Sequence, residues 1–212
     1  MIDPFLRLSA NTDIVKGYNT DGALQFDEDN SKTNSLLLTD TPTVTLISGV
    51  YRQFLLDINQ TGNDPLLSLH ELQIFVGNSP SLTAATVNAN GTLSFGSNAV
   101  LIYDLDSGTD GDSTVELDFS LKSGSGSGDI FAYIPDSLFV VPDASYKYVY
   151  LYSAFGDPNN DNDGFEEWSA SNPGLFPGPL VNTPEPSTFA IFGLGGLGFA
   201  IGAIRRRFRK AA

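Results

Sequence analysis

The chain has 212 residues, of which 41% are hydrophobic and 11% aromatic, a composition that supplies a packed core and excludes a disordered chain. It carries 25 acidic and 11 basic residues, and five of the basic ones stand in the last eight positions. The remainder is strongly acidic, which excludes nucleic-acid binding because that function needs basic patches. Cysteine is absent and histidine occurs once, at His70, so disulfides, thiolate metal sites and multi-histidine metal sites are excluded.

The first residues do not read as a secretory signal peptide. Residues 1–5 are not followed by an apolar stretch of the required length, and they carry no positively charged region. Two explanations are open: the sequence lacks part of its natural N-terminus, or export relies on the C-terminal tail alone. We expect the first.

Apolar and polar residues alternate with a period of two over residues 20–155, which predicts eight or more β-strands. Asn90-Gly91 favours a tight hairpin over residues 86–95. No segment of this region has sustained helical periodicity, so we predict an all-β fold, a β-sandwich or jelly-roll-like ectodomain over residues 1–156, with its strand order left open. The predicted strands are residues 43–48, 50–58, 66–76, 98–105, 113–121, 129–134, 138–141 and 146–152.

Two segments are low in complexity. Residues 123–128 alternate Ser and Gly and are expected to form a mobile loop, without the Lys-Ser/Thr continuation of a phosphate-binding loop. Residues 157–183 are rich in Asn, Asp, Pro and Gly and are expected to be a linker.

Oxygen-bearing side chains recur at alternate positions in the first part of this linker: Asp157, Asn159, Asp161 and Asp163. Such spacing suits a calcium loop, but an EF-hand starting at Asn159 would need Glu where Ala170 stands. A weak, irregular calcium site and a solvated acidic linker are therefore both open, and no other cofactor is expected. A second acidic cluster leaves the same two alternatives open: Asp104, Asp106, Asp110 and Asp112.

Four tyrosines share one face of the predicted strand 146–152: Tyr146, Tyr148, Tyr150 and Tyr152. They could be the core face of the strand, or, if they face solvent, a platform on which sugar rings stack. His70 is expected to be a surface or half-buried histidine rather than a general base, because no nucleophile motif accompanies it.

The C-terminal end reads as a membrane segment. Residues 187–204 contain no charge and are just long enough to cross a bilayer as one transmembrane helix. A basic tail over residues 205–210 follows, and it places that end in the cytoplasm. Its cations are Arg205, Arg206, Arg207, Arg209 and Lys210.

Directly before this segment stand Pro184, Glu185 and Pro186, which hold the backbone extended as a processing enzyme requires. The order of PEP motif, apolar span and arginine-rich tail over residues 184–210 resembles the PEP-CTERM sorting signal, also catalogued as the ice-binding protein C-terminal domain. The resemblance implies a Gram-negative exopolysaccharide producer, the membrane protease-transpeptidase exosortase as a partner, and cleavage near residues 184–186. The ice-binding label does not imply ice binding.

We therefore expect a non-enzymatic surface or matrix protein with a structural or adhesive role beside exopolysaccharide. It would be a single-pass protein of the cytoplasmic membrane before processing and would lie at the cell surface or outside the cell afterwards. A secreted polysaccharide-binding module and a small surface glycoside hydrolase are the alternatives. An exposed tyrosine face would favour the first alternative, and a cleft with two desolvated carboxylates the second.

Overall fold

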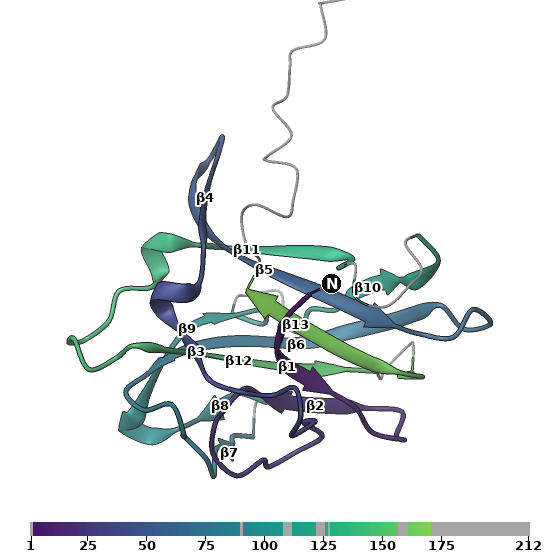
Figure 1. The fold of residues 1–212 in the computed structure, drawn as a ribbon, viewed down its shortest axis with the longest axis horizontal. Coiled ribbons are helices and arrows are strands. Elements are labelled where there is room, and N and C mark those ends of the chain that lie inside the picture. The colour runs from purple at the N-terminus through teal and green to yellow at the C-terminus, as the bar shows by residue number, and fades with distance from the viewer. Residues whose placement is uncertain are drawn as a thin grey trace, which may run out of the picture. The chain divides into compact units, whose positions relative to one another are not determined.

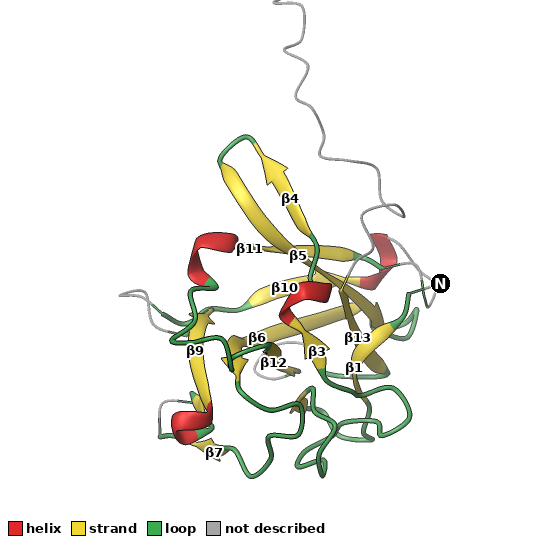
Figure 2. Ribbon diagram, turned by 60° about the vertical axis from the view of Figure 1, so that its left-hand side comes forward, coloured by secondary structure: helices red, strands yellow, loops and turns green. Residues whose placement is uncertain are grey.

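The computed structural model describes residues 2–89, 91–107, 112–121, 126, 128–156 and 161–170. All of them lie in the first of two compact units, Met1–Phe176. Within these residues the chain forms strands and single turns of 3-10 helix, which confirms the all-β prediction (Figure 2). The strands are β1 (Pro4–Leu8), β2 (Val15–Tyr18), β3 (Leu36–Leu37), β4 (Thr43–Leu46), β5 (Gly49–Asn59), β6 (Leu66–Gly77), β7 (Thr86–Val87), β8 (Leu93–Ser94), β9 (Ala99–Asp104), β10 (Val115–Asp118), β11 (Ile130–Pro135), β12 (Tyr148–Phe155) and β13 (Phe165–Ala170). The 3-10 turns are η1 (Leu38–Asp40), η2 (Gly96–Asn98), η3 (Phe119–Leu121) and η4 (Asp136–Leu138).

The strands build two larger antiparallel sheets and one small hairpin (Figure 1). The first sheet has the order β1-β13-β5-β11, and β4 also pairs with β5. Because Arg52 of β5 pairs with both β4 and β11, and Leu56 with both β13 and β11, β4 and β13 follow one another along the same edge of β5. The second sheet has the order β10-β6-β12-β2, with β9 on β6 and β3 on β12, and the hairpin is β7-β8.

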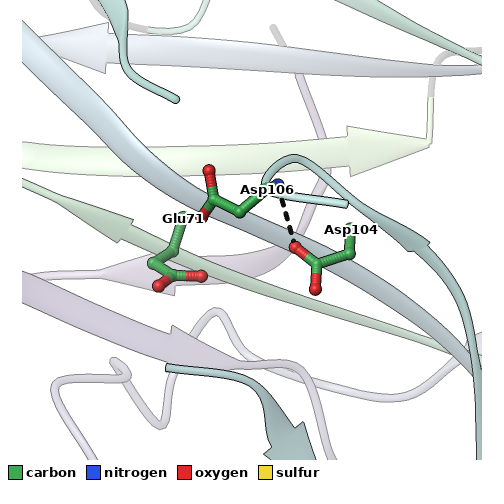
Figure 3. Close-up of side chains that lie close together, drawn as sticks. All are labelled: Glu71, Asp104 and Asp106. Atoms are coloured by element: carbon green, nitrogen blue, oxygen red, sulfur yellow. Dashed lines mark hydrogen bonds between the residues drawn. The ribbon is translucent and has the colours of Figure 1, made fainter. Parts of the chain in front are cut away.

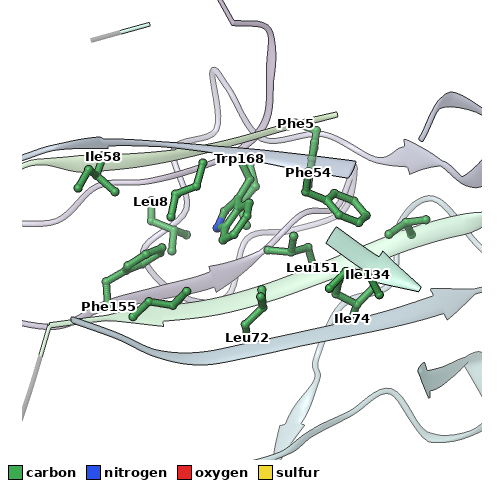
Figure 4. Close-up of a cluster of buried hydrophobic side chains, with 14 of the residues drawn as sticks. Phe5, Leu8, Phe54, Ile58, Leu72, Ile74, Ile134, Leu151, Phe155 and Trp168 are labelled. Carbon is green, nitrogen blue, oxygen red and sulfur yellow. The ribbon is translucent and has the colours of Figure 1, made fainter. Parts of the chain in front are cut away.

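The main core lies between the two larger sheets and draws side chains from both (Figure 4). Trp168 of β13 is fully buried there, and its indole Nε1 donates to Ser153 Oγ of β12 at 3.0 Å. This hydrogen bond joins the two sheets and satisfies the polar atom of the one tryptophan in the chain. Glu166, two residues earlier on the same face, is also fully buried, and its pKa is raised well above the ordinary value by desolvation.

A second core lies on the other face of the second sheet. Tyr150 and Tyr152 of β12 pack there against Phe75 of β6, under a layer of loops that includes β7 and β8. The Tyr150 hydroxyl donates to the Ser79 carbonyl at 2.6 Å and accepts from the Leu82 amide at 2.9 Å. The predicted tyrosine strand is therefore buried on both faces.

The outer face of the first sheet is also partly covered. Asp57 of β5 points away from the main core and is nevertheless fully buried. Its carboxylate accepts hydrogen bonds from the amides of Gly126 and Gly128, each at 2.7 Å. The two described residues of the Ser/Gly segment are thus fixed on the sheet by one carboxylate, and the rest of that predicted mobile loop lies outside the described residues.

Two sequence predictions are wrong about where strands lie. Residues 157–183 were predicted to be a linker, yet β13 lies inside this range and occupies an interior position of the first sheet. Residues 138–141 were predicted to be a strand, but η4 and a loop stand there, because Arg52 of β5 binds Asp136 at 2.9 Å and stacks on the Phe139 ring. The predicted 86–95 hairpin is confirmed by the pairing of β7 with β8.

We predict that Asp57→Asn lowers the free energy of unfolding by about 1.5–3 kcal/mol, because an amide cannot replace a carboxylate that accepts two charge-assisted hydrogen bonds in a buried position. Urea denaturation followed by Trp168 fluorescence measures the change. The control is Asp64→Asn, at an exposed position in the turn after β5, which should shift stability by less than about 0.5 kcal/mol. Equal effects of the two substitutions would contradict the assignment.

Candidate functional site

The candidate site begins with an irregularity in β6. Its register against β12 pairs Glu71 with Ala154 and Leu69 with Phe155, so His70 is the extra residue of a β-bulge. Before the bulge the main core receives Leu67 and Leu69, and after it the even-numbered residues from Leu72 onward. The bulge thus changes which face of the strand is apolar and turns Glu71 out of the main core.

Glu71 meets two carboxylates from the end of β9 (Figure 3). One oxygen each of Glu71, Asp104 and Asp106 lies within 4.8 Å of the others. The three line an open pocket of about 440 Å³. Its other described lining residues are His70, Gly91, Thr92 and Asp112.

Backbone and amide contacts hold these acids in place. The Asp106 amide donates to Asp104 Oδ1 at 3.0 Å, and Asp106 Oδ1 accepts from the Ser113 amide at 2.6 Å. The buried Gln73 side chain donates to Glu71 Oε2 at 2.8 Å and accepts from the Leu93 amide at 2.9 Å. Gln73 thereby connects the pocket to the β7-β8 hairpin.

Gly91 forms the wall of the pocket nearest to Glu71. Its φ is +84°, and a Cβ built there would lie 2.5 Å from Glu71 Oε1. Both the backbone conformation and the close approach favour glycine at this position. The Asn-Gly turn that the sequence indicated therefore also makes room for a carboxylate.

The site concentrates negative charge in partly dehydrated surroundings. The pKa of Glu71 is raised to about 7, first by desolvation and then by the charges of Asp106, Asp104 and Asp112, against a lowering effect of the Gln73 hydrogen bond. Glu71 therefore changes its charge near neutral pH. The arrangement can hold a proton or present several carboxylate oxygens to a hard cation.

Sequence reasoning found part of this cluster. It named Asp104, Asp106 and Asp112, which the structure brings to one pocket, and Asp110, which lies outside the described residues. It missed Glu71. It expected a surface or half-buried histidine at His70, and the structure shows a half-buried one at the bulge. The signal for Glu71 was the change of apolar phase in residues 66–77, where two polar residues stand in succession.

The first predicted calcium loop is only partly described. Asp157 and Asn159 lie outside the described residues, and Asp161 and Asp163 are exposed. Asp163 Oδ2 accepts from the Thr61 hydroxyl at 3.0 Å, so this carboxylate binds the turn between β5 and β6. Calcium at this loop stays a prediction.

The structure places the tyrosine stripe in the interior. Tyr150 and Tyr152 are buried in the second core, and Tyr146 and Tyr148 are half-buried. The prediction that sugar rings stack on this stripe is therefore wrong, because the loop layer covers the face that Tyr150 and Tyr152 would offer to a sugar.

The predicted sorting residues, Pro184, Glu185 and Pro186, lie outside the described residues, as do the span 187–204 and the basic residues Arg205, Arg206, Arg207, Arg209 and Lys210. In the part of the chain that the structure describes, no helix is long and apolar enough to cross a bilayer.

Comparison with known families identifies the C-terminal segment of the chain. Residues 182–207 match the family model described as the PEP-CTERM protein-sorting motif, which confirms the resemblance seen in the sequence. No curated protein and no solved structure matches the chain. The match covers the tail, and it identifies a sorting signal for export to the cell surface.

We predict that Glu71→Gln raises stability increasingly as the pH rises. The folded-state pKa of Glu71 is about 7, against an ordinary value of 4.5, so from about pH 4.5 upward the unfolded chain loses this proton before the folded protein does. The unmodified protein is therefore destabilised through this window, and the glutamine variant lacks that loss. Denaturation curves from pH 4 to pH 8 should show a difference in unfolding free energy that grows with pH.

Asp3→Asn is the control for that experiment, because Asp3 is an exposed acid beside β1 in the other sheet. Its stability difference from the unmodified protein should not follow the pH profile of Glu71→Gln. A difference for Glu71→Gln that stays constant from pH 4 to pH 8 would contradict the electrostatic description of the pocket.

Calcium is predicted to raise the melting temperature more than magnesium does, since the clustered acids repel one another and a flexible set of oxygens suits calcium better. At about 100 times its dissociation constant, a cation that binds only the folded state adds roughly 2.7 kcal/mol. If calcium binds in the pocket, the double variant Asp104→Asn/Asp106→Asn should lose the rise in melting temperature. If it binds at the loop, Asp161→Asn/Asp163→Asn should lose it. Equal shifts in calcium, magnesium and sodium at matched ionic strength would show screening alone.

Proposed function

We propose that this exosortase-sorted surface protein has a non-enzymatic, structural or adhesive role in an exopolysaccharide matrix. The observation that carries the proposal is the PEP-CTERM sorting motif at residues 182–207. The span 187–204 would hold the exported chain in the cytoplasmic membrane as a single-pass protein, with the basic tail on the cytoplasmic side. Cleavage near residues 184–186 would then free the ectodomain for the cell surface.

The ectodomain fits a passive role through its packing. Both faces of the second sheet are occupied by cores, and Asp57 fixes a loop on the outer face of the first sheet. The acidic surface would keep copies of the protein soluble and apart. An anionic polysaccharide would be reached through shared cations rather than through direct ion pairs.

Polysaccharide binding remains the second candidate, at a different place from the one that the sequence suggested. Phe131 and Tyr133 of β11 lie almost parallel, with ring centroids 5.9 Å apart and an interplanar angle of 27°, and Tyr133 is exposed. Two neighbouring aromatic faces on one strand are a surface on which sugar rings can stack. Loss of binding to the extracted polysaccharide in Tyr133→Ala, with Tyr148→Phe as a control, would favour this candidate.

Glycoside hydrolysis would use Glu71 as the acid and an aspartate of the pocket as its partner, since a pKa of about 7 leaves Glu71 protonated in part of the molecules at neutral pH. The described residues that line the pocket are acids, His70, Gly91 and Thr92, so they provide no aromatic surface for a sugar ring. We therefore place hydrolysis behind both other candidates.

We predict that the protein recovered from the matrix ends near residue 186. In a host with exosortase, enzymatic digestion of the exopolysaccharide should release a form whose intact mass lacks the apolar span and the basic tail. Glu185→Ala should instead accumulate as the full chain in the membrane fraction. Recovery of only the full-length, membrane-bound form of the unmodified protein would contradict the sorting proposal, and a processed form that digestion does not release would contradict the matrix role.

A further inference from the structure

The hairpin formed by β4 and β5 extends beyond the body of the first sheet (Figures 1 and 2). At its turn Ile47 is 89% exposed, and Val50 is also exposed. Residues 41–51 contain no charged side chain, in a chain whose formal net charge is −14. Among the described residues, nothing buries Ile47, and Val50 keeps 46% of its surface exposed.

Further exposed apolar residues lie at the same end of the sheet. β11 runs antiparallel to β5 and ends at Pro135 opposite Tyr51, so η4 and the loop after it follow beside the base of the hairpin. Leu138 is exposed there, and Val140 is 76% exposed. We call Ile47, Val50, Leu138 and Val140 the apolar tip.

Val50 of the apolar tip also lines a shallow depression of about 400 Å³ between the start of β5 and the end of β11. The one acid among its described lining residues, Asp136, is paired with Arg52 at 2.9 Å. The Tyr51 hydroxyl lies 2.8 Å from the Ser48 hydroxyl, and its ring presents an apolar body beside a polar edge. Tyrosine in this form is typical of the boundary between lipid headgroups and acyl chains.

The chain leaves the sandwich at this same end. Ala170, the last residue of β13, pairs with Phe54, and the next pair along that edge of β5 is Arg52 with Thr43 of β4. β13 therefore runs toward the hairpin and stops at its base. From there the segment 171–186 reaches at most roughly 55 Å before the apolar span begins.

We propose that the apolar tip inserts into the lipid interface while the chain is held by the span 187–204. The inference rests on the proposed membrane segment and adds a second contact with the bilayer, made by the ectodomain. Apolar side chains at such a surface enter about 5–10 Å into the headgroup and acyl boundary. The tip has too few of them to bind strongly alone, but the tether raises its local concentration at the bilayer to the millimolar range.

The occupant is a lipid surface rather than a charged partner. Residues 41–51 of the hairpin carry no cation for anionic lipids and no acid for a basic protein, and Arg52 at its base is paired with Asp136, so the contact is made by apolar area. It would orient the ectodomain with the end of β13 toward the bilayer, which places the start of the cleavable segment near the membrane.

The test uses brominated phosphatidylcholine, whose acyl chains quench tryptophan by contact. Ile47→Trp is made in the full chain and reconstituted into vesicles of this zwitterionic lipid, and vesicle-bound protein is isolated by flotation. Trp168 is 1% exposed and contributes a constant background. Leu121→Trp is the matched control: Leu121 is 84% exposed and follows β10 beside the turn between β5 and β6, roughly 30 Å from the hairpin along β5.

We expect the brominated lipid to quench Ile47→Trp about twofold or more compared with Leu121→Trp. Equal quenching at the two positions, or none at either, would overturn the proposal. Emission from Ile47→Trp that shifts with protein density but is not quenched by bromine would overturn it in favour of contact between copies of the chain. Phe199→Trp, inside the proposed span, distinguishes failure of the apolar tip from failure of the membrane segment. If Phe199→Trp is quenched and Ile47→Trp is not, only the proposal for the tip is contradicted. If Phe199→Trp is not quenched, the proposed membrane segment is contradicted, and the proposal for the tip with it.

Discussion

Burial of the β6-β12 pair on both faces is the constraint on which the rest of the ectodomain depends. A sheet with one wet face needs only one partner layer, but Leu151 and Phe155 fill the main core while Tyr150 and Tyr152 project the other way. The chain must therefore supply a third layer, and it does so with loops and the β7-β8 hairpin. Those loops are held by the hydroxyl group of Tyr150, which binds the backbone of Ser79 and Leu82, since a buried tyrosine needs partners for its polar end.

The same double burial explains why the acidic pocket lies where it does. One extra residue at His70 lets β6 keep leucines in the main core on both sides of the bulge, and the residue after it is turned toward the end of β9. β9 has a comparable irregularity, because its register skips Ile102 just before Asp104. Two bulges thus bring three carboxylates together, and the buried Gln73 couples them to the covering hairpin.

The strands over residues 66–76 and 146–152 were predictable because the first is a long, mostly apolar run and the second has tyrosine at every second position. β13 could not be predicted, because Glu166 and Glu167 are typical of solvent-exposed loops and only Trp168 indicates a buried strand. Those acids are tolerated because of tertiary contacts that no local pattern reveals: Arg7 binds Glu167, and burial raises the pKa of Glu166 well above its ordinary value. Glu71 escaped prediction for a related reason, since a bulge is a property of two paired strands. The sorting signal could be predicted in full because its three segments follow one another directly in the sequence and need no tertiary contact to be recognised.

The pairing of β1 with β13 has a consequence for the time course of folding. Arg7 and Glu167, which join these strands, are 160 residues apart, and β1 has no other strand partner among the described residues. The first sheet cannot close until nearly the whole ectodomain has emerged from the machinery that exports it. Contacts this distant in sequence form slowly, because the loop must be ordered before the pairing stabilises it. A chain that crossed a membrane in extended form would thereby be kept from completing its fold on the wrong side, because β13, the strand that completes it, ends at Ala170 and the sorting motif begins only at residue 182.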